Sequence, residues 1–251
     1  MRFKLALLLA ATVVPAAVAA DLSVLCAGAV ESALRKLARH YEREFGRDVD
    51  VVFGTGPELT KRLAGGDRAD VLIAPARVME HAAKAGAIVV DSQVAVARVG
   101  VGVAVRRGTA PPNVATAAAL KDALLRAGSV VYNKASTGQY LETLFERMGI
   151  LERIEPKTTR YVSAAEVLEH VLRGSRGSEI GFGPITAIKD FEPRGVTLVG
   201  PLPADVQSYT TYIAAVMSAA RAPDAGRDFI RYLTSAAARR TFAATGVESS
   251  R

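Results

Sequence analysis

The chain has 251 residues, 50% of them hydrophobic, and a formal net charge of +7 at pH 7. This length and apolar content allow one large domain or two lobes with a full hydrophobic core. The single cysteine, Cys26, excludes an intrachain disulfide, and the basic residues form no Lys/Arg block of the kind that binds nucleic acid.

Residues 1–20 predict a secretory signal peptide. Arg2 and Lys4 precede a short apolar run with a proline break, and small residues follow it. The run is shorter than the roughly 20 apolar residues that span a membrane. We expect cleavage after Ala19 or Ala20 and a mature protein in the periplasm; the alternative is a buried first helix.

Strands and helices alternate along the first part of the mature chain. Spacings of three and four residues between Val30 and Phe45 place apolar side chains on one face of a helix, which Gly46 closes. Such alternation predicts a parallel sheet with helices on both faces. The expected strands are 22–27, 49–53 and 71–74, and the expected helices are 30–45, 57–63 and 77–85.

Residues 94–105 form an unusually long extended run. Strands usually span about five or six residues, so we expect this run to leave one sheet and enter another. A second long run, 207–217, follows a Pro- and Gly-rich turn, and we expect it to cross back. The remaining alternation predicts helices at 116–125, 141–148, 164–172, 224–233 and 235–244 and strands at 130–132, 158–162, 179–182 and 196–199.

The two crossing runs predict an α/β protein of two lobes, each a mainly parallel sheet flanked by helices, joined by a double-crossover hinge. Both ends of the mature chain, 21–98 and 206–251, would form the first lobe, and 99–205 the second. Such lobes can close on a ligand by hinge motion.

Four junctions between a strand and the next helix have the character of anion sites. Small residues let the backbone approach a ligand, and the N–H groups at a helix start favour negative charge. Because ligands of parallel α/β sheets lie beyond the carboxyl ends of the strands, we expect the four junctions to share one cleft. The alternative is that the hydroxyl residues among them are ordinary helix N-caps. The candidate ligand residues are Gly28 and Ala29, Thr55 and Gly56, Ser136, Thr137 and Gly138, and Ser163 and Ala164.

Arg98 is the one charge inside the first crossing run, where an unpaired charge is costly. It either pairs with a carboxylate in the structure or faces a ligand anion at the hinge. The three histidines, His40, His81 and His170, lie on predicted helices without metal-ligand spacing, and no nucleophile motif accompanies them. We therefore expect no metal, no cofactor and no enzyme activity.

The motifs together resemble the periplasmic molybdate-binding family of ABC-transporter solute receptors, which are type II periplasmic binding proteins. Leu25–Leu34 is similar to that family's first strand and helix, Val52–Gly56 to its second ligand loop and Ala69–Ala74 to its third strand. Val171–Gly174 and Glu179–Phe182 are similar to its distal lobe. The resemblance covers nearly the whole mature chain. It implies a two-lobed, double-hinged receptor whose partner is a membrane permease.

The ligand loops depart from the pattern of that family. Ala29 stands where the family has a serine that gives its hydroxyl to the oxyanion, and residues 54–56 read Gly-Thr-Gly where it has Gly-Ser-Ser. Pro184 falls near the family's distal tyrosine ligand, and Ser136 and Ala164 fall near its backbone donors. The resemblance therefore implies a ligand cradle with fewer hydroxyls than a tetrahedral oxyanion receives.

We expect an exported, monomeric receptor that captures a small anion for an ABC importer, with an organic carboxylate favoured over molybdate. If Arg98 faces the cleft, it would pair with such a carboxylate. Three alternatives stay open. They are a true molybdate- or tungstate-binding protein, a secreted hydrolase or lyase that uses Ser136 or Thr137, and a periplasmic sensor that feeds a signalling partner.

Overall fold

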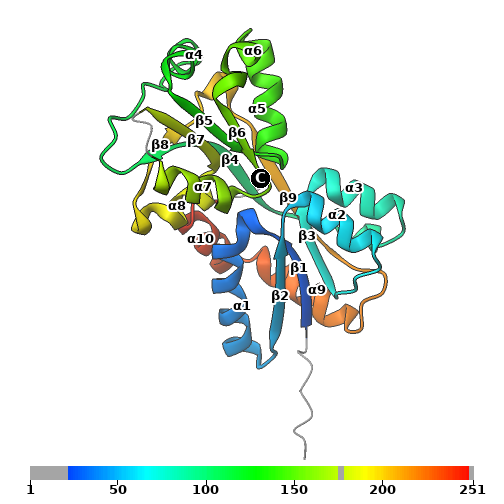
Figure 1. Ribbon diagram of the computed structural model, residues 1–251. Coiled ribbons are helices and arrows are strands. Elements are labelled where there is room, and N and C mark those ends of the chain that lie inside the picture. The colour runs from blue at the N-terminus through cyan, green and yellow to red at the C-terminus, as the bar shows by residue number, and fades with distance from the viewer. Residues whose placement is uncertain (1–21, 175–177, 249–251) are drawn as a thin grey trace, which may run out of the picture.

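The computed structural model describes residues 22–174 and 178–248. The predicted signal peptide, residues 1–20, therefore lies outside the described residues. Within the described ranges, no helix is both long and apolar enough to cross a membrane. The chain forms a mixed α/β protein with two lobes, joined by long strands that run between them (Figure 1).

The sheet of the first lobe contains β1 (Leu22–Ala27), β2 (Val49–Gly54), β3 (Val71–Pro75), β9 (Tyr209–Val216) and the first half of β4 (Val94–Arg106). Its strand order is β2-β1-β3-β9-β4. β1 is parallel to β2 and β3, whereas β9 is antiparallel to β3 and β4. Among the described strands of this sheet, only β9 runs in the direction opposite to the others. The sheet is therefore mainly parallel.

The sheet of the second lobe contains β5 (Ser129–Asn133), β6 (Thr158–Tyr161), β7 (Glu179–Pro184), β8 (Val196–Pro201) and the second half of β4. β5 is parallel to β6 and β7, and β4 lies antiparallel between β7 and β8. Here β4 is the strand that runs against its neighbours. The α/β fold with two mainly parallel sheets, predicted from the alternation of elements, is therefore confirmed.

The crossing strand β4 belongs to both sheets, as its length predicts. Val94–Gly100 pairs with β9, and Val101–Arg106 pairs with β7 and β8. The return crossing is shorter than predicted, because β9 begins at Tyr209 and pairs within the first sheet alone. A 3-10 turn, Ala204–Val206, precedes it and keeps this part of the chain out of the strand ladder. The side chain of Gln207 takes over, accepting from Val101 N–H and donating to Val101 C=O, both at 3.0 Å.

Helices flank both sheets, and the first of them, α1, shows the predicted buried face. Leu34, Leu37 and Tyr41 are buried, but Phe45 is 50% exposed, because the chain turns away at Gly46 in the left-handed conformation (φ 64°). The first lobe carries α1 (Glu31–Phe45), α2 (Gly56–Ala64), α3 (Ala76–Lys84), α9 (Pro223–Leu233) and α10 (Ala236–Ala244). The second carries α4 (Ala117–Arg126), α5 (Ser136–Arg147), α6 (Leu151–Ile154), α7 (Ala164–Arg173) and α8 (Ile185–Phe191).

Each lobe has its own hydrophobic core. In the first lobe, Cys26 is fully buried among strand and helix side chains, where it packs as an apolar residue. In the second, the rings of Tyr132, Phe145 and Phe182 form edge contacts with centroids 5.8–5.9 Å apart. Because the two cores are separate, the lobes could move relative to each other at a hinge without any change in the packing inside either lobe.

Candidate functional site

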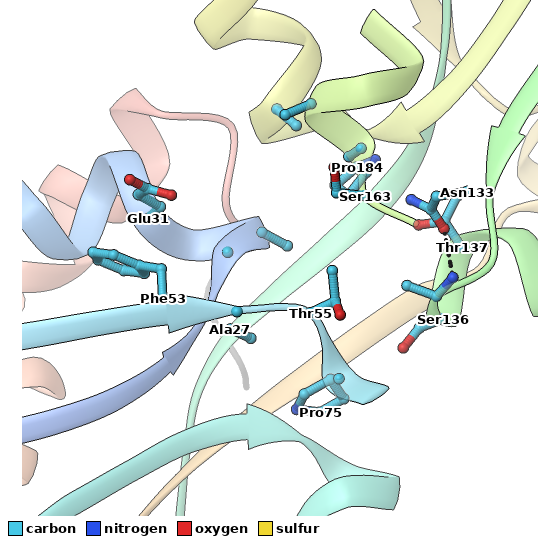
Figure 2. Close-up of a pocket in the computed structure, with 18 of the residues that line it drawn as sticks. Ala27, Glu31, Phe53, Thr55, Pro75, Asn133, Ser136, Thr137, Ser163 and Pro184 are labelled. Atoms are coloured by element: carbon cyan, nitrogen blue, oxygen red, sulfur yellow. Dashed lines mark hydrogen bonds between the residues drawn. The ribbon is translucent and has the colours of Figure 1, made fainter. Parts of the chain in front are cut away.

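A cavity of about 570 Å³ lies between the two lobes, beyond the carboxyl ends of the parallel strands (Figure 2). Both lobes contribute to its walls, and its volume falls within the roughly 300–1,000 Å³ that is usual for small-molecule pockets. The predicted ligand residues that line it are Gly28, Ala29, Thr55, Gly56, Ser136, Thr137, Ser163, Ala164 and Pro184. The structure therefore brings all four predicted junctions to one cavity.

Helix starts dominate the wall of this cavity. Each N-cap residue in question ends a strand or lies within two residues of its end, and α2, α3, α5 and α7 point the positive ends of their dipoles at the same space. The 3-10 turn before α1 and the short helix α8 complete the ring. The N-cap residues that line the cavity are Ala27, Thr55, Pro75, Ala135, Ser163 and Pro184.

Several backbone N–H groups at these helix starts are available to a ligand. The first turn of a helix has no internal acceptors for its N–H groups. Within the described part of the chain, no hydrogen-bond partner satisfies the N–H groups of Gly56, Ser136, Thr137, Ala164 and Ala165. All five residues line the cavity. Converging donors of this kind suit a carboxylate or another small anion.

The hydroxyl groups of the cavity differ in how free they are. Ser163 caps α7, and its hydroxyl also donates to Glu166 Oε2 at 3.1 Å. Thr55 caps α2 by accepting from Glu58 N–H at 3.3 Å, but its own proton has no acceptor among the described residues. Ser136 and Thr137 are not N-caps, since Ala135 holds that position in α5. Ser163 is therefore the residue that best fits the alternative of an ordinary helix N-cap.

Asn133, at the end of β5, is a cavity residue that the sequence motifs did not single out. It is 2% exposed, and its Oδ1 accepts from Ala135 N–H at 3.0 Å and Gly138 N–H at 3.3 Å. Because both acceptor bonds fix the oxygen, the amide nitrogen is the group left for the cavity, and Figure 2 shows it on the cavity side. An Asn two residues before a helix N-cap is the local signal for such a turn.

Gly138 and Arg98 are predicted ligand residues that the structure places outside the cavity wall. A Cβ on Gly138 would lie 1.5 Å from the carbonyl oxygen of Asn133, so the glycine permits the close turn that orients Asn133. The guanidinium of Arg98 lies 4.4 Å from the ring centre of Tyr209, and its backbone pairs with Glu248. In this position Arg98 fixes the end of the described chain to the crossing strand.

One wall of the cavity is charged, which the sequence did not reveal. Glu31 and Arg35 of α1 and Asp190 of α8 line it. Burial raises the pKa of Asp190, and this outweighs the opposing hydrogen bond from Ser32. Arg35 and Glu31 form an ion pair of 2.7 Å. In the sequence these side chains look like any other charges on the exposed faces of helices. They line a cavity only because the two lobes meet beside them.

The histidines lie elsewhere. His170 bonds to Tyr161 and Glu179, both at 2.8 Å, and His40 bonds to Tyr232 at 3.0 Å. Among the described residues that line the cavity there is no histidine, and the described chain holds no group of three or more His, Cys, Asp or Glu arranged for a metal ion. The polar chemistry of the cavity thus consists of helix N–H groups, hydroxyls, one buried amide and the charged wall.

Comparison with known proteins gives a family and a fold. The family described as bacterial extracellular solute-binding protein matches residues 22–248. A protein from a Pseudomonas species named aconitate isomerase is 30% identical over 250 residues, which cover 97% of this chain and 94% of that protein. The alignment thus extends over almost the full length of both chains.

Solved structures agree on the arrangement of the lobes. The periplasmic molybdate-binding protein of Azotobacter vinelandii matches with a TM-score of 0.75 at 15% identity, over 92% of this chain and 100% of that one. PEB3 of Campylobacter jejuni with bound L-phospholactate matches with a TM-score of 0.72 at 17% identity, over 92% and 100%. At these identities the likeness shows the fold alone.

Proposed function

This chain belongs to the family of bacterial extracellular solute-binding proteins, and we propose that it captures a small organic carboxylate between its lobes for an ABC importer. The observation that carries the proposal is the ring of helix starts around one cavity. N–H groups that have no partner among the described residues meet there with the buried amide of Asn133. Such donors stabilise a carboxylate without requiring a cation.

An organic carboxylate fits this cavity better than molybdate does. Ala29 and Pro184, which stand where the resemblance implies hydroxyl ligands, both line the cavity and bring no hydroxyl. A cavity of about 570 Å³ also holds more than a compact tetrahedral ion. PEB3, which shares the fold, binds L-phospholactate, and the 30%-identical relative is named for acting on aconitate, a tricarboxylate.

The mechanism we propose is closure of the lobes around the ligand. The first lobe comprises 21–98 and 206–251, and the second 99–205. The change of pairing within β4 between Gly100 and Val101 supports a hinge at that point. We further propose that residues 1–20 are cleaved on export to the periplasm, that the receptor is a monomer, and that its partner is the membrane permease.

A second candidate function is the isomerisation of a polycarboxylate, which the aconitate isomerase relative favours. Moving a double bond along such a molecule requires a group that takes a proton from one carbon and returns one to another. Asp190 would suit this role, because it lines the cavity and burial raises its pKa. In this case the same cradle would hold the carboxylates while the charged wall moved the proton.

Hydrolysis and signalling have less support as functions of this cavity. A hydrolase or lyase that used Ser136 or Thr137 would need a base beside the hydroxyl, and among the described residues neither hydroxyl is hydrogen-bonded to a base. A sensor would bind the same ligands and differ only in its partner. Co-purification with a permease or with a kinase separates a sensor from an importer receptor.

A thermal-shift screen of the purified protein against molybdate, tungstate and mono-, di- and tricarboxylates tests the proposal. A ligand at 100 times its Kd stabilises by about 2.7 kcal/mol, or roughly 5–10 °C for a protein of this size. We expect carboxylates to give such a shift. Selective stabilisation by molybdate would contradict the carboxylate proposal.

Proton NMR of cis- and trans-aconitate, each with a catalytic amount of the protein, separates the two candidate functions. A receptor binds either isomer and leaves it unchanged, whereas an isomerase brings both samples to the same mixture. Replacement of Asp190 by Asn should then abolish conversion and leave binding in place.

A further inference from the structure

Arg35 is the one cationic side chain among the described residues that line the cavity. Its Nε donates to Glu31 Oε1 at 2.8 Å, and its Nη2 forms an ion pair of 2.7 Å with the same oxygen. Its guanidinium carbon lies 4.6 Å from the ring centre of Phe53, which also lines the cavity. The ion pair and the aromatic ring together fix the guanidinium at the wall before a ligand arrives.

One edge of this guanidinium is still available. An arginine offers five N–H donors along two edges, and Glu31 occupies the edge formed by Nε and Nη2. The edge formed by Nη1 and Nη2 has no partner among the described residues, and the side chain is 54% exposed. That edge has the geometry for two parallel hydrogen bonds to a carboxylate.

The position of Arg35 differs from that of the helix-start donors. Figure 2 shows Glu31 and Phe53, the two neighbours of Arg35, on the opposite side of the cavity from Asn133 and Ser136. A single carboxylate held at Asn133 and Ser136 therefore leaves Arg35 without a ligand group. A molecule with two or more carboxylates could occupy both places.

The acidic residues of the cavity do not compete for this edge. Glu58 Oε2 accepts from Thr55 N–H at 2.7 Å within the cap of α2, and Glu31 holds the other edge of Arg35. The hydroxyl of Ser32 and the charge of Lys36 both lower the pKa of Asp190, although burial outweighs them. Among the described residues, none of the three carboxylates is hydrogen-bonded to the edge of Arg35 that Nη1 and Nη2 form.

We propose that Arg35 binds a second carboxylate of the ligand, so that the protein selects di- and tricarboxylates over monocarboxylates. This inference rests on the proposed function, since it presumes that a first carboxylate binds at the helix starts. It names the class of solute that the cavity takes. Glu31 and Phe53 act as positioning residues, because they hold the guanidinium in place for the ligand.

Calorimetry with butanoate, glutarate and propane-1,2,3-tricarboxylate tests this inference. These probes are saturated, so their binding is measured whether or not the protein is an isomerase. Arg35→Gln removes one charge-assisted interaction, which contributes about 1.5–3 kcal/mol, so affinity for the di- and tricarboxylate should fall about 10- to 100-fold. Affinity for butanoate should not change.

Arg39→Gln is the matched control, because Arg39 is an exposed arginine of α1 that does not line the cavity. It should leave all three affinities unchanged, and melting without ligand checks that both variants fold. If the parent protein binds none of the probes, the proposed function fails and this inference with it. If the parent binds the tricarboxylate and Arg35→Gln binds it equally well, the inference alone is overturned. Tighter binding of glutamate than of glutarate would also overturn the inference, because the acidic side chains of the wall would then bind the ammonium group of the ligand.

Discussion

At the scale of single residues, the hydrogen bonds that a polar side chain of the cavity already makes decide which of its atoms can still bind a ligand. The hydroxyl of Ser163 is used in both directions by Glu166, whereas that of Thr55 retains a free proton among the described residues. The oxygen of Asn133 is committed to two backbone donors, and its nitrogen is left for the ligand. The role of a polar residue here thus depends on which of its atoms the fold has already used.

Asn133→Asp should separate ligand binding from folding. The aspartate keeps an acceptor for Ala135 and Gly138, but it replaces the amide donor by a negative charge facing the ligand carboxylate. Loss of one hydrogen bond to a charged group alone costs about 1.5–3 kcal/mol, so affinity for propane-1,2,3-tricarboxylate, measured by calorimetry, should fall at least about 10-fold.

Asn113→Asp is the control for this change. Asn113 is exposed, lies away from the cavity and accepts from Ala115 N–H at 3.0 Å in the same local turn. This variant should bind as the parent does. Equal affinities for all three proteins would mean that the amide of Asn133 does not contact the ligand.

Thr55→Val should affect both stability and binding, because the hydroxyl of Thr55 caps α2 as well as facing the cavity. Loss of an N-cap costs about 1 kcal/mol, which urea unfolding without ligand measures. Loss of the ligand hydrogen bond should weaken binding a further 10-fold or so. Thr55→Ser keeps the hydroxyl and should restore both properties. A stability loss with unchanged affinity would make Thr55 a cap alone.

At the scale of elements, Asp70 joins β1, β3 and the start of α9. The carboxylate is 1% exposed and accepts from the N–H and hydroxyl of Ser23 and from the N–H groups of Arg221 and Ala222, at 2.7–2.8 Å. Ala222 is the N-cap residue of α9 and has no side-chain cap of its own. A carboxylate that is distant in sequence, just before β3, therefore serves as the cap and as the counter-charge of this helix.

Asp70→Asn should lower the free energy of unfolding by about 1.5–3 kcal/mol, because an amide cannot accept all four bonds. Burial opposes ionisation of Asp70, but the hydrogen bonds outweigh it and lower the pKa. Its contribution to stability is therefore present above the unfolded pKa of about 4 and is lost as the pH falls through the lower folded pKa.

Urea unfolding of parent and variant between pH 7 and pH 3 measures both effects. The stability gap between the two proteins should narrow at the acid end. Asp67→Asn provides the control, since Asp67 forms a half-exposed pair with Arg62 that contributes little. A gap that did not change with pH would show that Asp70 acts without its charge.

At the scale of the whole molecule, two lobes with separate cores meet around one cavity. β4 provides one connection, and the side chain of Gln207 holds the returning chain against it. Across the cleft, the hydroxyl of Thr186 on α8 donates to the carbonyl of Ala29 at 2.6 Å. Under the proposed closure of the lobes, a direct contact of this kind would favour the closed arrangement and contribute to ligand affinity.

Thr186→Val should weaken binding by favouring the open arrangement. A hydrogen bond of this type contributes about 0.5–1.5 kcal/mol, so affinity should fall about 2- to 10-fold. Small-angle scattering should show a smaller radius of gyration with ligand than without it, and the variant should need more ligand to reach that value. Thr143→Val, on an exposed face of α5, is the control. A radius that ligand leaves unchanged in the parent would contradict closure.

The sequence by itself determined the order of elements, the long crossing strand and the junctions that line the cavity. These features depend on local rules: the period of apolar residues, the residues that start and end helices, and the rule that parallel strands place their carboxyl ends at one edge. For that reason the sequence alone suffices to place Thr55, Ser136 and Ala164 at a shared cleft.

Only the tertiary structure decided which further side chains reach the cavity. Arg35 and Asp190 line it although they appear in the sequence as ordinary helix charges, whereas Arg98, which the sequence singles out, does not line it. The short return strand, which Gln207 completes, was likewise not visible in the apolar pattern. The physical reason is that these positions depend on how the two lobes meet. Packing and hinge geometry decide which residues from distant parts of the chain face each other, and no local sequence pattern encodes this.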